Sequence, residues 1–237
     1  MIDIFDIDAK LIKHFKNYSS SPSAIMLFVY MKARFSLSYR ELEELAIIRG
    51  CRLDHATIQR WVVTFSFILD NKVRKRKKPV NGSWRMDETY IRLNGKWVYL
   101  YRAVDSNGDT VDFLLRARRD AIAAKAFFRK AFKNNDIPDK ITVDKSGSNK
   151  AALDFFNKDL SNDNKYEIRQ IKYLNNIVEQ DHRFIKKRTK PMLGFKSFNS
   201  AKKTISSIEN VRMIQKGQIE GLDNGKSTFE NFVALMA

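Results

Sequence analysis

The 237-residue chain carries 44 lysine and arginine residues against 27 aspartate and glutamate residues, a formal net charge of +17. Such an excess of one sign indicates a polyanionic partner or an anionic surface, with nucleic acid the leading candidate. A basic background composition without such a partner is the alternative. Cys51 is the only cysteine, which excludes an intrachain disulfide and a cysteine-based zinc site.

The lengths of the apolar runs disfavour membrane insertion, and the acidic N-terminus disfavours export. The longest runs, which begin at Ala24 and Trp61, fall well short of the roughly 20 residues that a membrane span requires. Asp3, Asp6 and Asp8 precede any apolar run, so the basic flank of a signal peptide is missing. We therefore expect a soluble protein of the reducing cytoplasm.

The N-terminal part of the chain is predicted to be helical. Ser21-Pro22 starts a helix over Ser23 to Phe35, because proline at the first helical position gives up a hydrogen bond that would lack a partner anyway. Ser38 and Glu41 have the spacing of a capping box, which predicts a second helix over Tyr39 to Ile48.

A third helix, capped by Asp54, completes a pattern typical of a helix-turn-helix, whose second helix reads DNA. An ordinary helical hairpin with a solvated polar face is the alternative. The candidate DNA contacts are the polar residues beside its apolar stripe: His55, Thr57, Gln59 and Arg60. Because this pattern is complete within residues 1–71, we predict a small all-α DNA-binding domain there that folds by itself.

Lys72 to Lys78 is a block of basic residues interrupted by Val73. It is interpreted as part of a linker over residues 72–82 that can lie on phosphates. The hydrophobic period changes from 3.6 to 2 just after it, which marks a domain boundary.

Three strand-like runs follow: Trp84–Leu93, Lys96–Asp105 and Asp109–Ala117. They are separated by Asn94-Gly95 and Asn107-Gly108, and Asn-Gly is the strongest short hairpin signal because both turn positions need positive φ. The sequence thus predicts an antiparallel three-stranded meander.

Helices and short strands alternate after the meander, which indicates an α/β fold with a mixed sheet. The expected elements are a helix over Asp120–Lys133, a strand over Ile141–Val143, a helix over Asn149–Leu160, a strand over Ile168–Ile171, a basic helix containing Glu179 and a helix over Ala201–Met213.

Three acidic residues stand in three of these elements: Asp87, Asp144 and Glu179. Three acids are the minimum needed to hold two hard cations on oxygen ligands. Asp87 and Glu88 point to opposite faces of a strand, so only one of them is expected to share a site with Asp144, and periodicity does not say which. Asp144 stands where a strand ends before a glycine-containing turn, the edge at which α/β sheets place their sites.

The helix that contains Glu179 has two stripes at 100° per residue. The apolar stripe is Leu174, Ile177, Val178, Phe184 and Ile185, and the polar stripe is Glu179, His182, Arg183 and Lys186. Asp181 falls within the apolar stripe, and the sequence offers no reason for it.

Three segments together resemble the catalytic blocks of bacterial insertion-sequence transposases of the DDE class, specifically the small cointegrate-forming group numbered six. They read WRMDETYIRLNGKWVYLYRAVD, ITVDKSGS and YLNNIVEQDHRFIKKR. Glu179 lies 35 positions after Asp144, as in that group, and Lys186 lies seven after Glu179, where the class usually has a basic residue. The resemblance extends from about Leu37 to Lys216.

This resemblance implies a ribonuclease-H-like fold over residues 83–216, followed by a tail over residues 217–237, and it assigns Asp87 rather than Glu88 to the site. Asp87, Asp144 and Glu179 would hold two Mg²⁺ ions, for which Mn²⁺ substitutes. His182, Arg183 and Lys186 would position the DNA strand.

The implied activity is transposition. A homodimer or larger assembly, nucleoid-associated in a bacterial cytoplasm, would bind the terminal inverted repeats, nick the ends and join the 3′ hydroxyls to target DNA. Two alternatives remain: a ribonuclease-H-type nuclease, which needs no helix-turn-helix, and a non-catalytic DNA-binding regulator derived from a transposase, which needs no intact acids.

Overall fold

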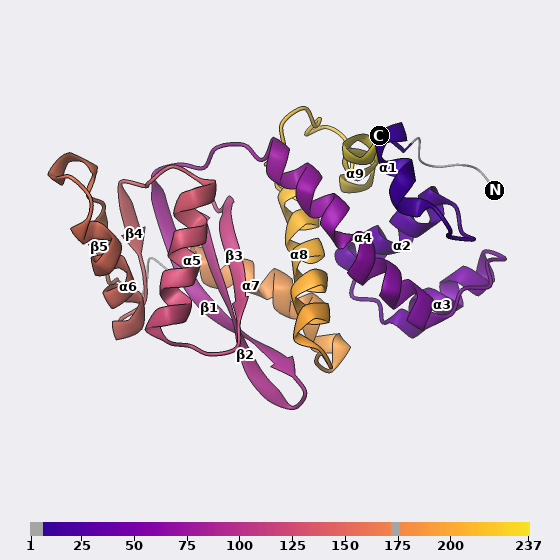
Figure 1. Cartoon of the computed structure of the whole chain (residues 1–237), viewed down its shortest axis with the longest axis horizontal. Coiled ribbons are helices and arrows are strands. Elements are labelled where there is room, and N and C mark those ends of the chain that lie inside the picture. Colours follow the sequence, from indigo (N-terminus) through magenta and orange to yellow (C-terminus); the bar gives the residue numbers. More distant parts are fainter. Residues whose placement is uncertain (1–6, 172–175) are drawn as a thin grey trace. The chain divides into compact units, whose positions relative to one another are not determined.

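The computed structural model describes residues 7–171 and 176–237. The chain forms two compact units. One comprises the chain up to Lys78 together with Lys187–Ala237, and the other comprises Pro79–Lys186 (Figure 1). Among the described residues, no helix is both long and apolar enough to cross a membrane.

The unit Pro79–Lys186 is built on a five-stranded sheet in the order β3-β2-β1-β4-β5. Its strands are β1 (Ser83–Leu93), β2 (Lys96–Asp105), β3 (Thr110–Arg116), β4 (Lys140–Thr142) and β5 (Glu167–Arg169). The first three strands pair antiparallel, whereas β4 pairs parallel to both β1 and β5. The predicted meander and the mixed sheet are therefore confirmed.

The two Asn-Gly turns behave differently. Asn94 and Gly95 both have positive φ, 46° and 74°, as a two-residue hairpin turn requires. At the second turn Gly108 has φ 84°, and one carboxylate oxygen of Asp105 accepts hydrogen bonds from the backbone N–H groups of Asn107 and Asp109. This turn is thus held by a side chain in addition to its glycine.

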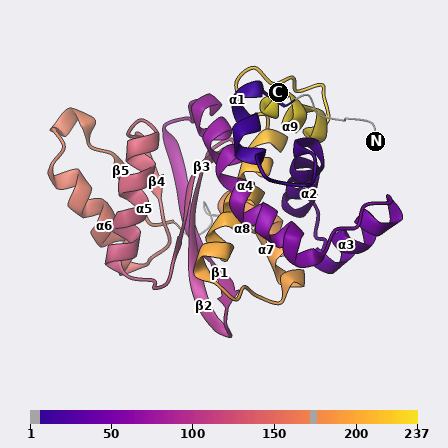
Figure 2. The ribbon, with the colours of Figure 1, turned by 45° about the vertical axis from the view of Figure 1, so that its right-hand side comes forward.

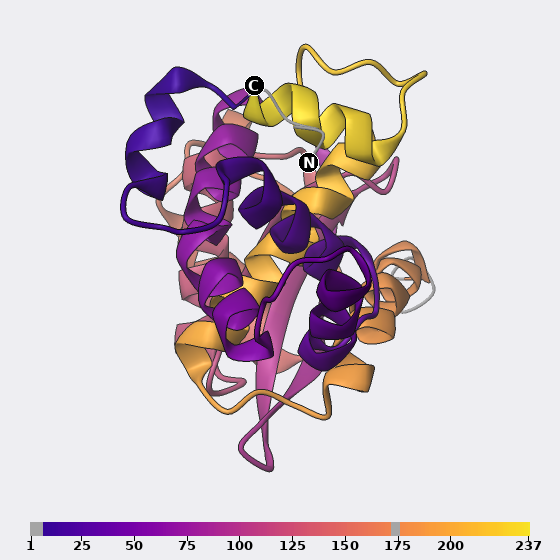
Figure 3. The ribbon, with the colours of Figure 1, turned by 90° about the vertical axis from the view of Figure 1, so that its right-hand side faces the viewer.

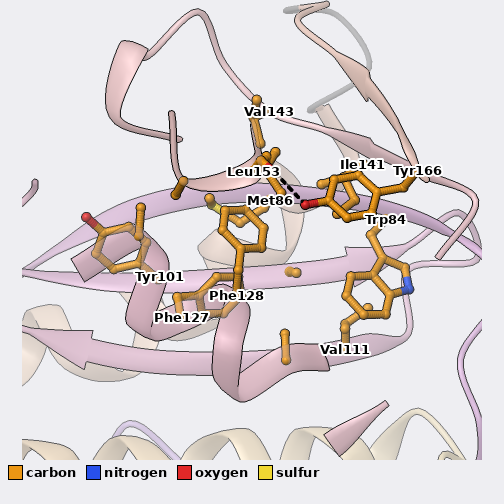
Figure 4. Close-up of a cluster of buried hydrophobic side chains, with 14 of the residues drawn as sticks. Trp84, Met86, Tyr101, Val111, Phe127, Phe128, Ile141, Val143, Leu153 and Tyr166 are labelled. Carbon is orange, nitrogen blue, oxygen red and sulfur yellow. Dashed lines mark hydrogen bonds between the residues drawn. The ribbon is translucent and has the colours of Figure 1, made fainter. Parts of the chain in front are cut away.

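Helices cover the sheet on both faces: α5 (Ala121–Asn134) and α6 (Gly147–Lys158) pack side by side on one face, and α7 (Asn176–Thr189) contacts the other through Arg102 of β2 (Figure 2). Between the sheet and α5 lies an aromatic core that includes Trp84, Tyr101 and Phe127 (Figure 4). The hydroxyl of Tyr166 donates to the carbonyl of Leu153 within it, so this buried polar group is satisfied. This is the ribonuclease-H-like architecture that the sequence resemblance implies.

The other unit is helical (Figure 3). Its elements are α1 (Ala9–Ile12), η1 (Lys13–Phe15), α2 (Pro22–Arg34), α3 (Tyr39–Ile48), α4 (His55–Arg76), η4 (Lys190–Met192), α8 (Phe198–Gln215) and α9 (Thr228–Met236). Ser21 caps α2, Ser38 and Glu41 form the expected capping box on α3, and Asp54 caps α4. The helix starts predicted from sequence are confirmed.

The predicted linker over residues 72–82 is wrong for its first part, because α4 continues to Arg76. Val73 is fully buried and extends the apolar stripe of the helix by one more turn. Arg74 pairs with Asp70 one turn earlier, at 2.8 Å. Basic residues also suit the last turn of a helix, where the backbone dipole is negative.

The last helices also differ from the expected division of the chain. The resemblance implies that residues 187–216 belong to the catalytic domain, but α8 packs against α2 and α4 of the helical unit. Ser206 and Asn210 of α8 donate hydrogen bonds to Asp70 of α4. In the tail, α9 was not predicted, although the capping box of Ser227 and Glu230 signals it.

Candidate active site

The parallel pairing of β1 with β4 brings two of the predicted acids together. Arg85 of β1 lies opposite Thr142, the last residue of β4. Asp87 and Asp144 each stand two residues farther along: Asp87 lies within β1, and Asp144 lies just beyond the end of β4. Their carboxylates belong to a group whose ligand oxygens all lie within 4.8 Å of one another.

Glu88 is the third member of that group, which contradicts the prediction that only one of the adjacent acids could share a site with Asp144. The two side chains do leave β1 on opposite faces: Glu88 continues the buried series of Trp84 and Met86. However, β4 ends at Thr142 and leaves the edge of β1 open at this point. Side chains from both faces can therefore reach the same edge.

Glu179 joins these acids in a polar pocket of about 740 Å³. It is carried by α7, which is held on the sheet by an ion pair between Asp181 and Arg102 of β2, at 2.6 Å and almost fully buried. This pair explains why an acid occurs in the apolar stripe of α7. Tyr173 and Leu174, with which the predicted motif and its apolar stripe begin, lie outside the described residues.

The pocket concentrates negative charge. The pKa of Asp87 is raised to about 7 by burial and by the carboxylates of Glu88, Asp144 and Glu179. Carboxylate oxygens are hard ligands of the kind that divalent cations such as Mg²⁺ prefer, and a bound cation would offset this repulsion. The donor set thus fits a divalent metal.

Arg119, in the loop before α5, supplies positive charge at the rim of the pocket. Its guanidinium lies 2.9 Å from Asp144 and 3.3 Å from Glu88. Asp144 also accepts hydrogen bonds from the backbone of Ser146 and the side chain of Asn149. These donors hold the Asp144 carboxylate at the end of β4. Arg119 could not be predicted as a site residue from the sequence, because a single arginine in a basic chain carries no signal of its own.

His182 is not on an exposed face with the other predicted strand contacts of α7. It is 3% exposed, and burial together with Arg102 and Lys186 lowers its pKa to about 3. The imidazole is therefore neutral, and its Nδ1 lies 3.7 Å from Asp87. His182 lines the pocket from a buried position, so its predicted contact with the DNA strand stays a prediction, whereas Arg183 and Lys186 are exposed at the pocket.

The candidate contacts on α4 divide in the same way. His55 Nδ1 lies 2.9 Å from Glu43 and 3.4 Å from Asp54, so it faces carboxylates rather than open solvent alone. Thr57 is bonded to Asp54 and to Arg60. Gln59 and Arg60 are exposed, and they are the two residues of this set best placed to meet another molecule.

Known proteins match most of this chain. A family model described as a DDE domain matches residues 81–218. The transposase for insertion sequence-like element IS431mec of Staphylococcus aureus is 37% identical over 205 residues, which cover 86% of this chain and 90% of the relative. This chain belongs to the DDE transposases of insertion-sequence family six.

The transposase for insertion sequence element IS257 in transposon Tn4003, also from Staphylococcus aureus, shows the same identity and coverage. Among solved structures, the HTLV-2 integrase catalytic core domain in complex with magnesium (dimeric form) has a TM-score of 0.45 and 14% identity, covering 66% of this chain and 99% of that one. As a DDE transposase, the protein is a metal-dependent polynucleotidyl transferase, and its family uses divalent metals.

Proposed function

We propose that this transposase binds the terminal inverted repeats of its own insertion sequence, nicks the DNA at the element's ends and transfers the freed 3′ hydroxyls to target DNA. The observation that carries the proposal is the pocket in which Asp87, Asp144 and Glu179 converge from β1, the end of β4 and α7.

Asp87, Asp144 and Glu179 are the proposed ligands of Mg²⁺, with Mn²⁺ as a substitute. Two divalent cations would activate the attacking water or hydroxyl and stabilise the charge that develops on the scissile phosphate. Burial and the neighbouring carboxylates raise the pKa of Asp87 to about 7, so a cation bound there would displace a proton near neutral pH. Glu88 pairs with Arg119 and lies beside the carboxylates of Asp87 and Asp144.

Basic residues are proposed to place the DNA. Arg183 and Lys186 lie on the exposed side of α7 at the pocket, where they can bind phosphates on either side of the scissile bond. Gln59 and Arg60 of α4 are proposed to read base edges of the terminal repeats, as the second helix of a helix-turn-helix does. The first pair thus serves cleavage and the second serves recognition of the ends.

Amide substitutions test the assignment of the acids. Asp87→Asn, Asp144→Asn and Glu179→Gln keep the shape of each side chain but remove the charge that retains cations. Purified variants are incubated with DNA from the ends of the element in Mg²⁺, Mn²⁺ or Ca²⁺, and nicked and joined strands are scored. We expect both products to be absent in all three variants while DNA binding survives.

Asp154→Asn is the matched control, because Asp154 is a partly exposed acid of α6 that pairs with a lysine of the same helix and does not line the pocket. It should keep full activity. Glu88→Gln should fall between the control and the three acids, since Glu88 lies in the carboxylate group but is neutralised by Arg119. Full activity of Asp144→Asn or Glu179→Gln, or cleavage that persists in a chelator, contradicts the metal-dependent assignment.

The proposal includes an assembly of at least two copies, because two ends of one element must be cut and joined together. Sedimentation of the protein with paired end DNA should show a dimer or a larger species. A complex that contains one copy of the protein on paired ends would contradict this part of the proposal.

A further inference from the structure

Four side chains form a contiguous group on the β1–β2 hairpin, here called the aromatic patch: the exposed Tyr90, Arg92 and Trp97 and the half-buried Tyr99. Tyr90 lies opposite Tyr99, and Arg92 lies opposite Trp97, in the antiparallel pairing of the two strands. The ring of Tyr90 is 5.5 Å from that of Tyr99 and 6.1 Å from that of Trp97. The guanidinium of Arg92 stands 4.9 Å from the Trp97 ring.

The patch is exposed because the hairpin is longer than the rest of the sheet (Figure 1). On β2 the pairing with β3 reaches only from Val104 to Tyr99, and on β1 the pairing with β4 reaches only to Arg85. Tyr90 is 49% exposed and Trp97 is 53% exposed. Single apolar residues on a surface need no explanation, but aromatic rings in mutual contact beside an arginine indicate a binding surface.

The aromatic patch is continuous with the candidate active site. Tyr90 lines the same pocket as the acids. Glu88, Tyr90 and Arg92 alternate along β1, so they lie on one face of the strand and run from the pocket toward the hairpin tip. A DNA strand whose phosphate sits at the acids can therefore place a neighbouring nucleotide beside Tyr90.

We propose that the aromatic patch holds an unpaired nucleobase of the DNA strand next to the scissile phosphate. The inference rests on the proposed function. Aromatic rings and the plane of an arginine stack on bases, and only a base that has left its pair exposes its faces for stacking. Arg92 adds positive charge for the neighbouring phosphate. Trp97 acts as a binding and positioning residue that keeps the opened strand in register with the acids.

Tryptophan emission provides a direct measurement, because the chain has three tryptophans and the other two, Trp61 and Trp84, are 3% and 1% exposed. Quenching by DNA therefore reports on Trp97. The probes are two duplexes of element-end DNA, one fully paired and one with a short mismatched bubble at the tip of the element. Titrations are made in Ca²⁺ with the full chain.

The bubble duplex should quench the emission strongly, the paired duplex should quench it less, and Trp97→Phe should abolish the difference while still binding DNA. In Mg²⁺, Trp97→Ala should slow nicking of the paired duplex by about 10-fold or more, as removal of one stacked base predicts. With the bubble duplex, Trp97→Ala should regain most of the lost nicking rate. Trp97→Phe should nick the paired duplex at nearly the rate of the unaltered protein. Ile122→Ala is the matched control, since Ile122 is an exposed apolar residue of the same unit that lies outside the aromatic patch.

Equal quenching by both duplexes, or no quenching by DNA that is bound, would overturn the inference. So would a homodimer that forms without DNA and is dissociated by Trp97→Ala, because the aromatic patch would then be a protein interface. The quenching needs no chemistry, so it should persist in Asp144→Asn. An active Asp144→Asn variant would contradict the proposed function and leave the quenching result intact, which distinguishes the two failures.

Discussion

At Asp87, burial and three neighbouring carboxylates act on one ionisation. The folded protein raises the pKa of this residue from 3.8 to about 7. Between those values the native state binds more protons than the unfolded state, so the free energy of unfolding falls as the pH rises. The difference corresponds to about 4 kcal/mol, at roughly 1.4 kcal/mol per pKa unit.

This shift makes a prediction for the metal-free protein. Denaturant unfolding in a chelator should show stability declining from about pH 4 to pH 7, and Asp87→Asn should flatten that decline. Mg²⁺ should restore stability at the high end of the range, because a cation replaces the proton. An unchanged pH dependence in Asp87→Asn would mean that another group is responsible.

The buried pair of Arg102 and Asp181 makes a second prediction at this scale. Asp181→Ala removes the 2.6 Å partner of an almost fully buried arginine, and should lower the free energy of unfolding by about 3–5 kcal/mol. Asp154→Ala, which breaks an exposed pair with Lys150, should change it by no more than about 1 kcal/mol. Urea unfolding compares the two. Similar midpoints for both variants would show that α7 does not depend on this ion pair.

Among the elements, α4 has two ends with different tasks. Its N-terminal half exposes Arg60, whose guanidinium donates to Thr57 and is thereby oriented. Arg60→Ala should reduce discrimination between element-end and random DNA by about 1–3 kcal/mol if it reads a base. Gel-shift titration with both DNAs measures the ratio. An equal decrease in affinity for both would instead make Arg60 a phosphate contact.

The C-terminal turn of α4 carries the basic block. Lys72 is paired with Asp8, and Arg74 with Asp70, so part of its charge is neutralised inside the protein. Lys75 and Arg76 are exposed. Replacing both by glutamine should reduce the salt dependence of DNA binding by roughly one unit of slope for each phosphate that is no longer neutralised, without changing sequence preference. An unchanged slope would show that this turn is only solvated.

On the scale of the whole molecule, the helical unit is discontinuous in sequence. The buried residues of α4 face α8 as well as α2, and α8 follows Pro79–Lys186 in the chain. The sequence predicts that residues 1–71 fold alone, but this packing predicts that they do not.

A fragment of residues 1–78 should therefore lack cooperative unfolding. The same residues joined by a flexible linker to residues 187–237 should unfold in one transition. Circular dichroism during thermal unfolding compares the two fragments. A cooperative transition in the shorter one would show that α8 is dispensable for the helical unit.

Local patterns were sufficient for much of this protein. Capping by Ser38 and Asp54, the Asn94-Gly95 turn and the alternation of the three strands depend on residues close in sequence, so the helix starts and the meander could be predicted. The 35-residue interval between Asp144 and Glu179 also lies in the sequence itself. That interval pointed to the transposase family, which the comparisons confirm.

Only the tertiary structure decided how these elements meet. Whether Glu88 reaches the acids depends on where β4 ends, and the burial of Asp181 and His182 depends on Arg102 in a distant strand. The packing of α8 against α4 likewise depends on which two apolar helix faces pair with each other. Periodicity shows that a face is buried, but it carries no information about the partner that buries it, because hydrophobic burial is non-directional.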